Sequence, residues 1–119
     1  MKLTAEKLGG RVYTVDADHR KLLHLAAVFA CNFVNHMLTA GKEITARAGF
    51  SFDVLEPLIK ETILKALADG PELSQTGPAV RNDRNTIEKH MDLLSFSPDL
   101  QLIYRELTRS IIEHYKNNQ

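Results

Sequence analysis

The chain has 119 residues, of which 44% are hydrophobic and 25% are charged, and this is the profile of one soluble globular domain. Its 15 basic residues balance its 15 acidic ones, which removes the broad positive field that attracts nucleic acid or an anionic membrane. We therefore expect no nucleic acid and no membrane as partners. The single cysteine, Cys31, excludes an internal disulfide and is expected of a cytoplasmic protein. No apolar run approaches ~18 residues, so no membrane span is expected.

The N-terminal residues precede the helical part of the chain. We expect Lys2 to Leu8 to be a helix remnant that Gly9-Gly10 ends, and Arg11–Val15 to be the only strand. One strand cannot form a sheet. It lies against the helices, pairs with a second copy, or belonged to a sheet in a preceding domain, and we favour the last of these.

A long helix is expected next. It begins at a cap on Asp16 or Asp18, runs to about Arg47 and is closed by Gly49. About 30 residues at ~1.5 Å each give a rod of ~45 Å, which is longer than a compact domain of this size is wide. Its apolar residues cover more than one face, so we expect a second copy of the chain to bury part of them. They are Leu23, Ala26, Ala27, Phe29, Ala30, Phe33, Val34, Met37 and Leu38.

Three further helices are expected, each bounded by capping residues and helix breakers. The expected boundaries are a start at Ser51 or Asp53 with a stop at Gly70-Pro71, a start near Asp83 or at Asn85 with Glu88 as the reciprocal cap, and a start at Ser97-Pro98.

The segment Gln75–Asp83 is too broken for a helix or a strand, and we interpret it as a binding loop. Gly77 adopts backbone angles closed to other residues, so the turn can present N–H groups beside the Arg81 guanidinium to a small anion or polar ligand. The alternative is an ordinary connection in which Arg81 pairs with Asp83 or Glu61. The candidate substrate contacts in this loop are Thr76, Gly77, Arg81 and Asp83.

A polar flank on the long helix is the second candidate site. Asn32, Asn35, His36 and Thr39 fall within about one-third of the helix circumference, and His24 lies at a similar angle to Asn35 but about three turns closer to the N-terminus. Asn32 and Asn35 are candidate substrate contacts, and His24 is a candidate for proton transfer near neutral pH. The alternative is that these side chains face solvent or bond within the protein.

Other chemistries have less support in the sequence. The five histidines show no compact metal-ligand spacing, so we expect no metal. No glycine-rich dinucleotide turn or Walker loop occurs, so we expect no cofactor on this chain alone. Cys31 has no activating base near it in sequence, and we interpret it as core filling rather than as a nucleophile.

Three segments carry a resemblance to a known family. His24–Phe33, Gln75–Asp83 and Thr86–His90 resemble the C-terminal helical domain called domain of unknown function 2520, and the likeness runs from about Tyr13 to Tyr115. In that family the domain follows a Rossmann-like domain. The whole is similar to reductases with a 6-phosphogluconate dehydrogenase C-terminal domain-like part, including pyrroline-5-carboxylate reductase.

The resemblance implies a division of the chain and a place for the cofactor. Residues 1–16 correspond to a remnant of a preceding Rossmann-like domain, a helix end and a strand, and residues 17–119 to the helical C-terminal domain. NADP or NAD is expected on the Rossmann domain, which would be absent from this chain. In the hydroxyacid-dehydrogenase relatives a catalytic lysine lies four residues before an asparagine, whereas Val28 lies four residues before Asn32 here. His24 and Asn32 are the remaining catalytic candidates.

The expected fold is all-α, a helical bundle around one long central helix with a short N-terminal strand remnant. The expected function is that of a C-terminal substrate-binding and dimerisation domain of an NAD(P)-dependent oxidoreductase. The expected partners are a second copy, bound through the long helix, and a small carboxylate-bearing ligand held where Thr76, Gly77 and Arg81 approach Asn32 and Asn35. The alternative is a non-catalytic helical dimerisation or interaction module.

Overall fold

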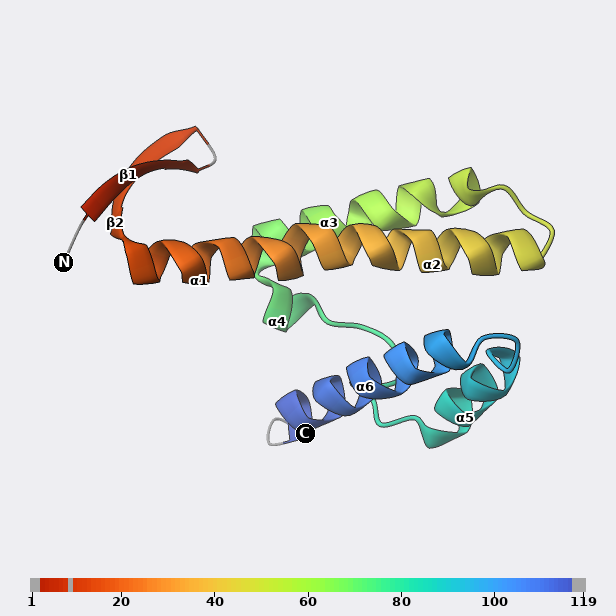
Figure 1. The fold of residues 1–119 in the computed structure, drawn as a ribbon. Helices are drawn as coiled ribbons and strands as arrows, with labels where there is room; N and C mark the ends of the chain where they lie inside the picture. Colours follow the sequence, from red (N-terminus) through yellow and green to blue (C-terminus); the bar gives the residue numbers. More distant parts are fainter. Residues whose placement is uncertain (1–2, 9, 117–119) are drawn as a thin grey trace. The chain divides into compact units, whose positions relative to one another are not determined.

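The computed structural model of the chain describes residues 3–8 and 10–116, which cluster into two compact units. Unit 1 is Met1–Phe52 and unit 2 is Asp53–Gln119. Unit 1 holds a β-hairpin followed by one long helix, and unit 2 holds the shorter helices (Figure 1). Helices therefore dominate the described residues, which confirms the expected all-α class.

The N-terminal hairpin corrects one expectation. Strand β1 (Leu3–Leu8) pairs antiparallel with β2 (Arg11–Asp16), with Leu3 opposite Asp16 and Leu8 opposite Arg11. The helix expected over Lys2–Leu8 is therefore wrong for residues 3–8, while Lys2 and Gly9 lie outside the described residues. The register leaves a two-residue connection, the commonest hairpin length, and Gly10 has a φ of +81°. The strand at Arg11 is confirmed, but it has a partner within the chain.

The long helix is confirmed, and it has an irregular middle. It runs without a break from Ala17 to Arg47 as α1 (Ala17–Ala27), a π-helical segment (Val28–Phe33) and α2 (Val34–Arg47). Asp16, not Asp18, is the N-cap, and its carboxylate accepts a hydrogen bond from the His19 N–H at 2.8 Å. Gly49, with a φ of +85°, follows the last turn as expected.

The same helix corrects the expectation that no apolar segment of the chain is long enough to span a membrane. By length and composition alone, Ala17–Arg47 could cross a membrane, because an 18-residue window has a mean hydropathy of 1.4. None of that window is buried. The core helix of a soluble protein and a signal sequence pass the same test, so one such helix is weak evidence for a membrane span.

Unit 2 follows the expected boundaries with small shifts. Its helices, after a 3-10 turn at Phe52–Leu55, are α3 (Glu56–Asp69), α4 (Pro71–Ser74), α5 (Arg84–Leu93) and α6 (Pro98–Tyr115). Gly70 ends α3 with a φ of +90°, and the Ser97 hydroxyl accepts the Leu100 N–H at 3.2 Å to cap α6. Asp83 rather than Asn85 caps α5. The four-residue α4 was not expected.

The core of unit 2 is small. Its buried apolar residues, among those described, are Ala79, Leu94 and Leu100. Hydrogen bonds also join its elements, among them one from the Gln101 amide to the Met91 carbonyl oxygen at 2.9 Å and one from the Tyr115 hydroxyl to the Glu72 carbonyl oxygen at 2.9 Å. The first ties α6 to α5 and the second ties α6 to α4. The core of unit 2 contains few apolar side chains, and hydrogen bonds between its elements supplement them.

Candidate functional site

The loop between α4 and α5 is closed by its own backbone. The Asp83 N–H donates to the Pro78 carbonyl at 2.8 Å, and the Asn82 N–H donates to the Ala79 carbonyl at 3.0 Å. Gly77 has a φ of +105°, and a Cβ placed there would meet nothing within 4 Å. The glycine is thus required by its backbone angle rather than by close packing. Two of the loop's N–H groups are used internally and are not open to a ligand.

Arg81 and Asp83 meet within this loop, as the alternative interpretation expected. An Arg81 Nη atom lies 3.8 Å from Asp83 Oδ2, which also accepts a hydrogen bond from the Thr86 hydroxyl at 2.8 Å. The other carboxylate oxygen accepts the Thr86 N–H at 3.2 Å. The Thr86 hydroxyl is the main reason that the pKa of the Asp83 carboxyl lies below its ordinary value. Asp83 is therefore the N-cap of α5, and its role as a substrate contact stays a prediction.

Thr76 borders a small cavity beside α3 and α4. The cavity has a volume of about 140 Å³ and is lined by Leu58, Glu61, Thr62, Lys65, Ser74 and Thr76. The Ser74 hydroxyl contacts both the Gly70 carbonyl at 2.9 Å and the Lys65 carbonyl at 3.2 Å. Ligand pockets usually measure roughly 300–1,000 Å³, so this space suits water or a small ion better than a substrate. Arg81 is not among its lining residues.

The polar flank of the long helix faces solvent. His24, Asn32, Asn35 and His36 are all exposed, and the Asn35 carbonyl accepts a weak hydrogen bond from the Thr39 hydroxyl at 3.4 Å. Their amide and imidazole groups are thus accessible to a ligand. These residues belong to unit 1, whereas Thr76, Gly77 and Arg81 belong to unit 2. The pocket expected to join the two groups stays a prediction.

The π-helical segment was missed by the sequence reasoning. It spans Val28–Phe33 and contains Asn32 and Cys31. Segments of this kind are rare and occur frequently at functional sites, because they displace side chains from the regular helical spacing. No residue in this stretch is a recognised signal for it. Cys31 is exposed, so its interpretation as core filling is wrong.

The comparisons identify the family. Residues 1–111 match the family described as "Domain of unknown function (DUF2520)". The chain belongs to this family. Among solved structures, the DUF2520 chain is similar to the C-terminal part of a Bacteroides fragilis protein described as a "putative NADP oxidoreductase", with 46% identity and a TM-score of 0.80. The match covers 83% of this chain but 38% of that one. No curated protein matches.

These matches settle the family and fold of the DUF2520 chain. The resemblance read from His24–Phe33 and Gln75–Asp83 is confirmed by the family match, which includes both segments. The helical fold matches the C-terminal region of the Bacteroides fragilis protein. The chain spans well under half of the length of that protein.

A second feature missed by the sequence reasoning is a groove between α5 and α6 of the DUF2520 chain. It has a volume of about 380 Å³. At one side the His90 Nδ1 lies 2.8 Å from the Tyr104 hydroxyl, and the two rings meet edge to face with centroids 5.7 Å apart. Partial burial raises the pKa of the Tyr104 phenol. The sequence shows that Arg84, Ile87 and Met91 share one face of a helix, but it does not show that this face borders a groove against α6.

Proposed function

We propose that this DUF2520 domain is the substrate-binding and dimerisation part of an NAD(P)-dependent oxidoreductase. The observation that carries the proposal is its 46% identity, at a TM-score of 0.80, to the C-terminal part of a protein described as a "putative NADP oxidoreductase". A Rossmann-like domain, which holds the pyrophosphate at a glycine-rich turn, supplies the NADP or NAD site in this proposal. The helical domain then contributes the substrate contacts and the contact between subunits.

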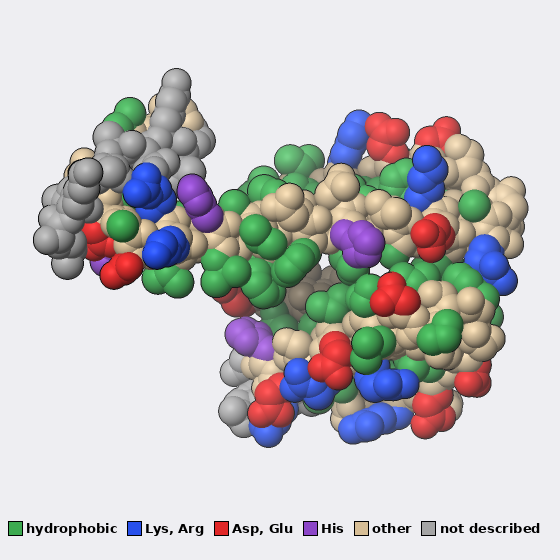
Figure 2. All heavy atoms as spheres, viewed as in Figure 1, with side chains coloured by type: hydrophobic (Ala, Val, Ile, Leu, Met, Phe, Trp, Pro, Cys, Tyr) green, Lys and Arg blue, Asp and Glu red, His purple; other side chains and the backbone are tan. Residues whose placement is uncertain are grey.

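The dimerisation role is supported by the exposed apolar side chains of the long helix. Leu22, Leu25, Phe29 and Phe33 are 61%, 52%, 64% and 49% exposed, and Figure 2 shows hydrophobic side chains on the surface of this helix. Their spacing of three or four residues places them along one stripe. A contiguous apolar surface on a folded protein marks an interaction site. A second copy related by a two-fold axis presents the same stripe and would bury both.

The substrate role is supported by accessible polar groups of the kinds that hold a small carboxylate. The proposed contacts are Asn32, Asn35, Thr76, Gly77, Arg81 and Asp83. The Arg81 side chain is 62% exposed, and its 3.8 Å separation from Asp83 is too long for a strong hydrogen bond. Its guanidinium is thus available to form a bidentate pair with a ligand carboxylate. His24 and Asn32 are the proposed catalytic groups.

The substrate role is tested by calorimetry with small carboxylates, using succinate and pyruvate as probes. Arg81→Ala is expected to weaken binding by about 1.5–3 kcal/mol, the value typical of a hydrogen bond to a charged group. Lys60→Ala is the matched control, because Lys60 is an exposed cation paired with Glu56 on α3 at 2.9 Å. If the Arg81→Ala variant and the unaltered protein bind these carboxylates equally well, Arg81 has a structural role and does not contact the ligand.

The cofactor assignment is tested by titration with NADPH. The isolated chain is expected neither to bind NADPH tightly nor to transfer hydride, because its sequence has no phosphate-binding glycine turn. Submicromolar affinity would contradict the assignment of the cofactor site to another domain.

The second candidate function is a non-catalytic helical dimerisation or interaction module. It is favoured by the contacts of Asp83, which caps α5 and meets Arg81, and by Val28 at the position of the relatives' lysine. Dimerisation without any carboxylate binding would favour this module. Carboxylate binding that depends on Arg81 would favour the substrate-binding role.

A further inference from the structure

The groove between α5 and α6 has the size of a small-molecule site. Its volume of about 380 Å³ lies within the roughly 300–1,000 Å³ that ligand pockets usually occupy. Both helices belong to unit 2, and Leu94, buried just beyond α5, and Leu100, buried in α6, belong to the core of that unit. The groove contains none of the loop or long-helix residues proposed above as substrate contacts.

The floor of the groove is apolar. Ile87 and Met91 come from one face of α5, and Ile112 comes from the facing side of α6. All three are half-buried, so each keeps apolar surface that a ligand could cover. The hydroxyl of Tyr104 is held by His90 at 2.8 Å, which fixes the Tyr104 ring at the side of the groove. An alkyl or ring portion of a ligand therefore has a preformed surface on which to lie.

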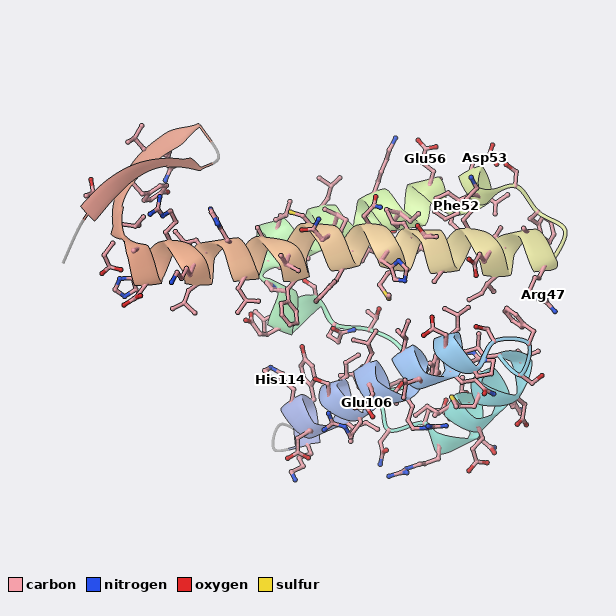
Figure 3. All side chains as sticks on the ribbon, in the orientation of Figure 1. Arg47, Phe52, Asp53, Glu56, Glu106 and His114 are labelled. Carbon is pink, nitrogen blue, oxygen red and sulfur yellow. The ribbon has the colours of Figure 1, made fainter. Side chains whose placement is uncertain are left out.

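The rim of the groove carries an excess of positive charge. Arg84 and Arg105 line it, and neither pairs with a carboxylate among residues 3–8 and 10–116. Arg109 also lines it and has an exposed partner in Glu106 at 3.2 Å, while Glu113 is occupied by Lys116 at 3.0 Å. Figure 3 shows Glu106 along α6.

The two arginines without a carboxylate partner in the described part of the chain, Arg84 and Arg105, favour an anion as the occupant of the groove. A bound anion gives a guanidinium group the charged partner that it lacks. A purely apolar occupant, such as the exposed stripe of a second copy, would bury the Arg84 and Arg105 guanidinium groups without partners, which is unfavourable.

We propose that the groove between α5 and α6 binds a small amphiphilic anion, whose apolar body lies on Ile87, Met91 and Ile112 and whose head group pairs with Arg84 and Arg105. A guanidinium recognises a carboxylate and a phosphate by the same bidentate geometry. The ligand class is therefore a carboxylate or phosphate monoester with an apolar portion. This site does not rest on the proposed oxidoreductase function and stands if that function fails.

The test uses four probes with the full chain: octanoate, octyl phosphate, octanol and acetate. The two amphiphilic anions are expected to bind at least about tenfold more tightly than octanol, which lacks the charge, or acetate, which lacks the tail, because a hydrogen bond to a charged group contributes about that factor or more. Preference between octanoate and octyl phosphate then identifies the head group. Octanol binding as tightly as both anions would overturn the proposal.

The methionines report where the probe binds. Met91 lines the groove and Met37 lies on the long helix, so their labelled methyl signals in NMR separate binding in the groove from binding to the long helix. Octanoate is expected to shift the Met91 signal and leave Met37 unchanged. A shift confined to Met37 would show that the tail binds the long helix and would refute the groove site.

Two substitutions test the head-group contacts. Arg84→Gln and Arg105→Gln remove one charge each at exposed positions and are each expected to weaken octanoate binding about tenfold. Lys60→Gln, on α3 and outside the groove, is the matched control and is expected to bind as the unaltered protein does. Unchanged affinity in both arginine variants, with helicity retained in circular dichroism, would overturn the proposal.

Discussion

Replacing Phe33 by glutamate tests whether the long helix joins two copies of the chain. Phe33 is 49% exposed, and its ring meets that of Phe29 edge to face at 5.0 Å. Complete burial of an exposed phenylalanine contributes about 1.5–3 kcal/mol, so covering the remaining half contributes ~0.7–1.5 kcal/mol per protomer. A two-fold interface counts the residue twice, which gives ~1.5–3 kcal/mol for the dimer.

This free energy sets the expected result. At 1.4 kcal/mol per factor of ten, Phe33→Glu is expected to raise the dimer dissociation constant by at least about 10-fold, and up to about 150-fold before the repulsion of two carboxylates is added. Light scattering or sedimentation across a dilution series measures the constant. Leu67→Glu is the matched control, because Leu67 is an exposed helical leucine on α3 rather than on the long helix.

Two results would refute the reasoning. One is an unaltered protein that stays monomeric at micromolar concentration. The other is a Phe33→Glu variant that keeps its helicity and dimerises as before, which would place the interface elsewhere. A stable interface buries about 1,200–2,000 Å² in total. A dimer formed through the long helix must therefore bury most of the apolar stripe.

Two further predictions concern unit 2. Leu100→Ala removes one of its few buried apolar side chains and is expected to cost about 2–5 kcal/mol in denaturant unfolding, whereas Leu102→Ala, at a position 52% exposed on the same helix, is expected to cost much less. Because the pKa of Asp83 is lowered in the folded state, its cap stabilises the protein above pH ~4 and is lost as the pH falls through the lower folded pKa. Asp83→Asn, which keeps a capping side chain, is therefore expected to flatten the acid loss of stability seen by circular dichroism, and an equally steep loss would contradict this.

Local signals predicted most helix boundaries because the responsible contacts are local. Asp16 and Ser97 each accept an N–H three residues on, and such bonds depend only on residues within one turn. The hairpin was missed because Gly9-Gly10 was interpreted as a helix end, although two glycines between short segments are also a hairpin signal. Asp83 rather than Asn85 is the N-cap of α5, because its carboxylate accepts two hydrogen bonds from Thr86.

The candidate site was predictable only in part. Sequence reasoning expected that Arg81 would pair with Asp83 if the loop were an ordinary connection, because the two are close along the chain. The α5–α6 groove depends on how two helices separated by a turn pack together, and residues such as Arg84 and Arg105 carry no local sign of that packing. The π-helical segment likewise contains no single residue that predicts it.

The π-helical segment places a proposed interface residue beside a proposed catalytic residue, so the dimer experiment needs a second variant. Phe33 and Asn32 are neighbours within Val28–Phe33, so a charge at position 33 disturbs both the proposed interface and a proposed catalytic group. Leu22 belongs to the same exposed stripe but lies in the regular helix α1, is not adjacent to His24 or Asn32, and is 61% exposed. Leu22→Glu therefore removes a comparable apolar contact outside the π-helical segment. If both variants dissociate the dimer while only Phe33→Glu loses ligand binding, association and ligand binding are separate properties of one helix; loss of binding in both would make the dimer itself a requirement of the site.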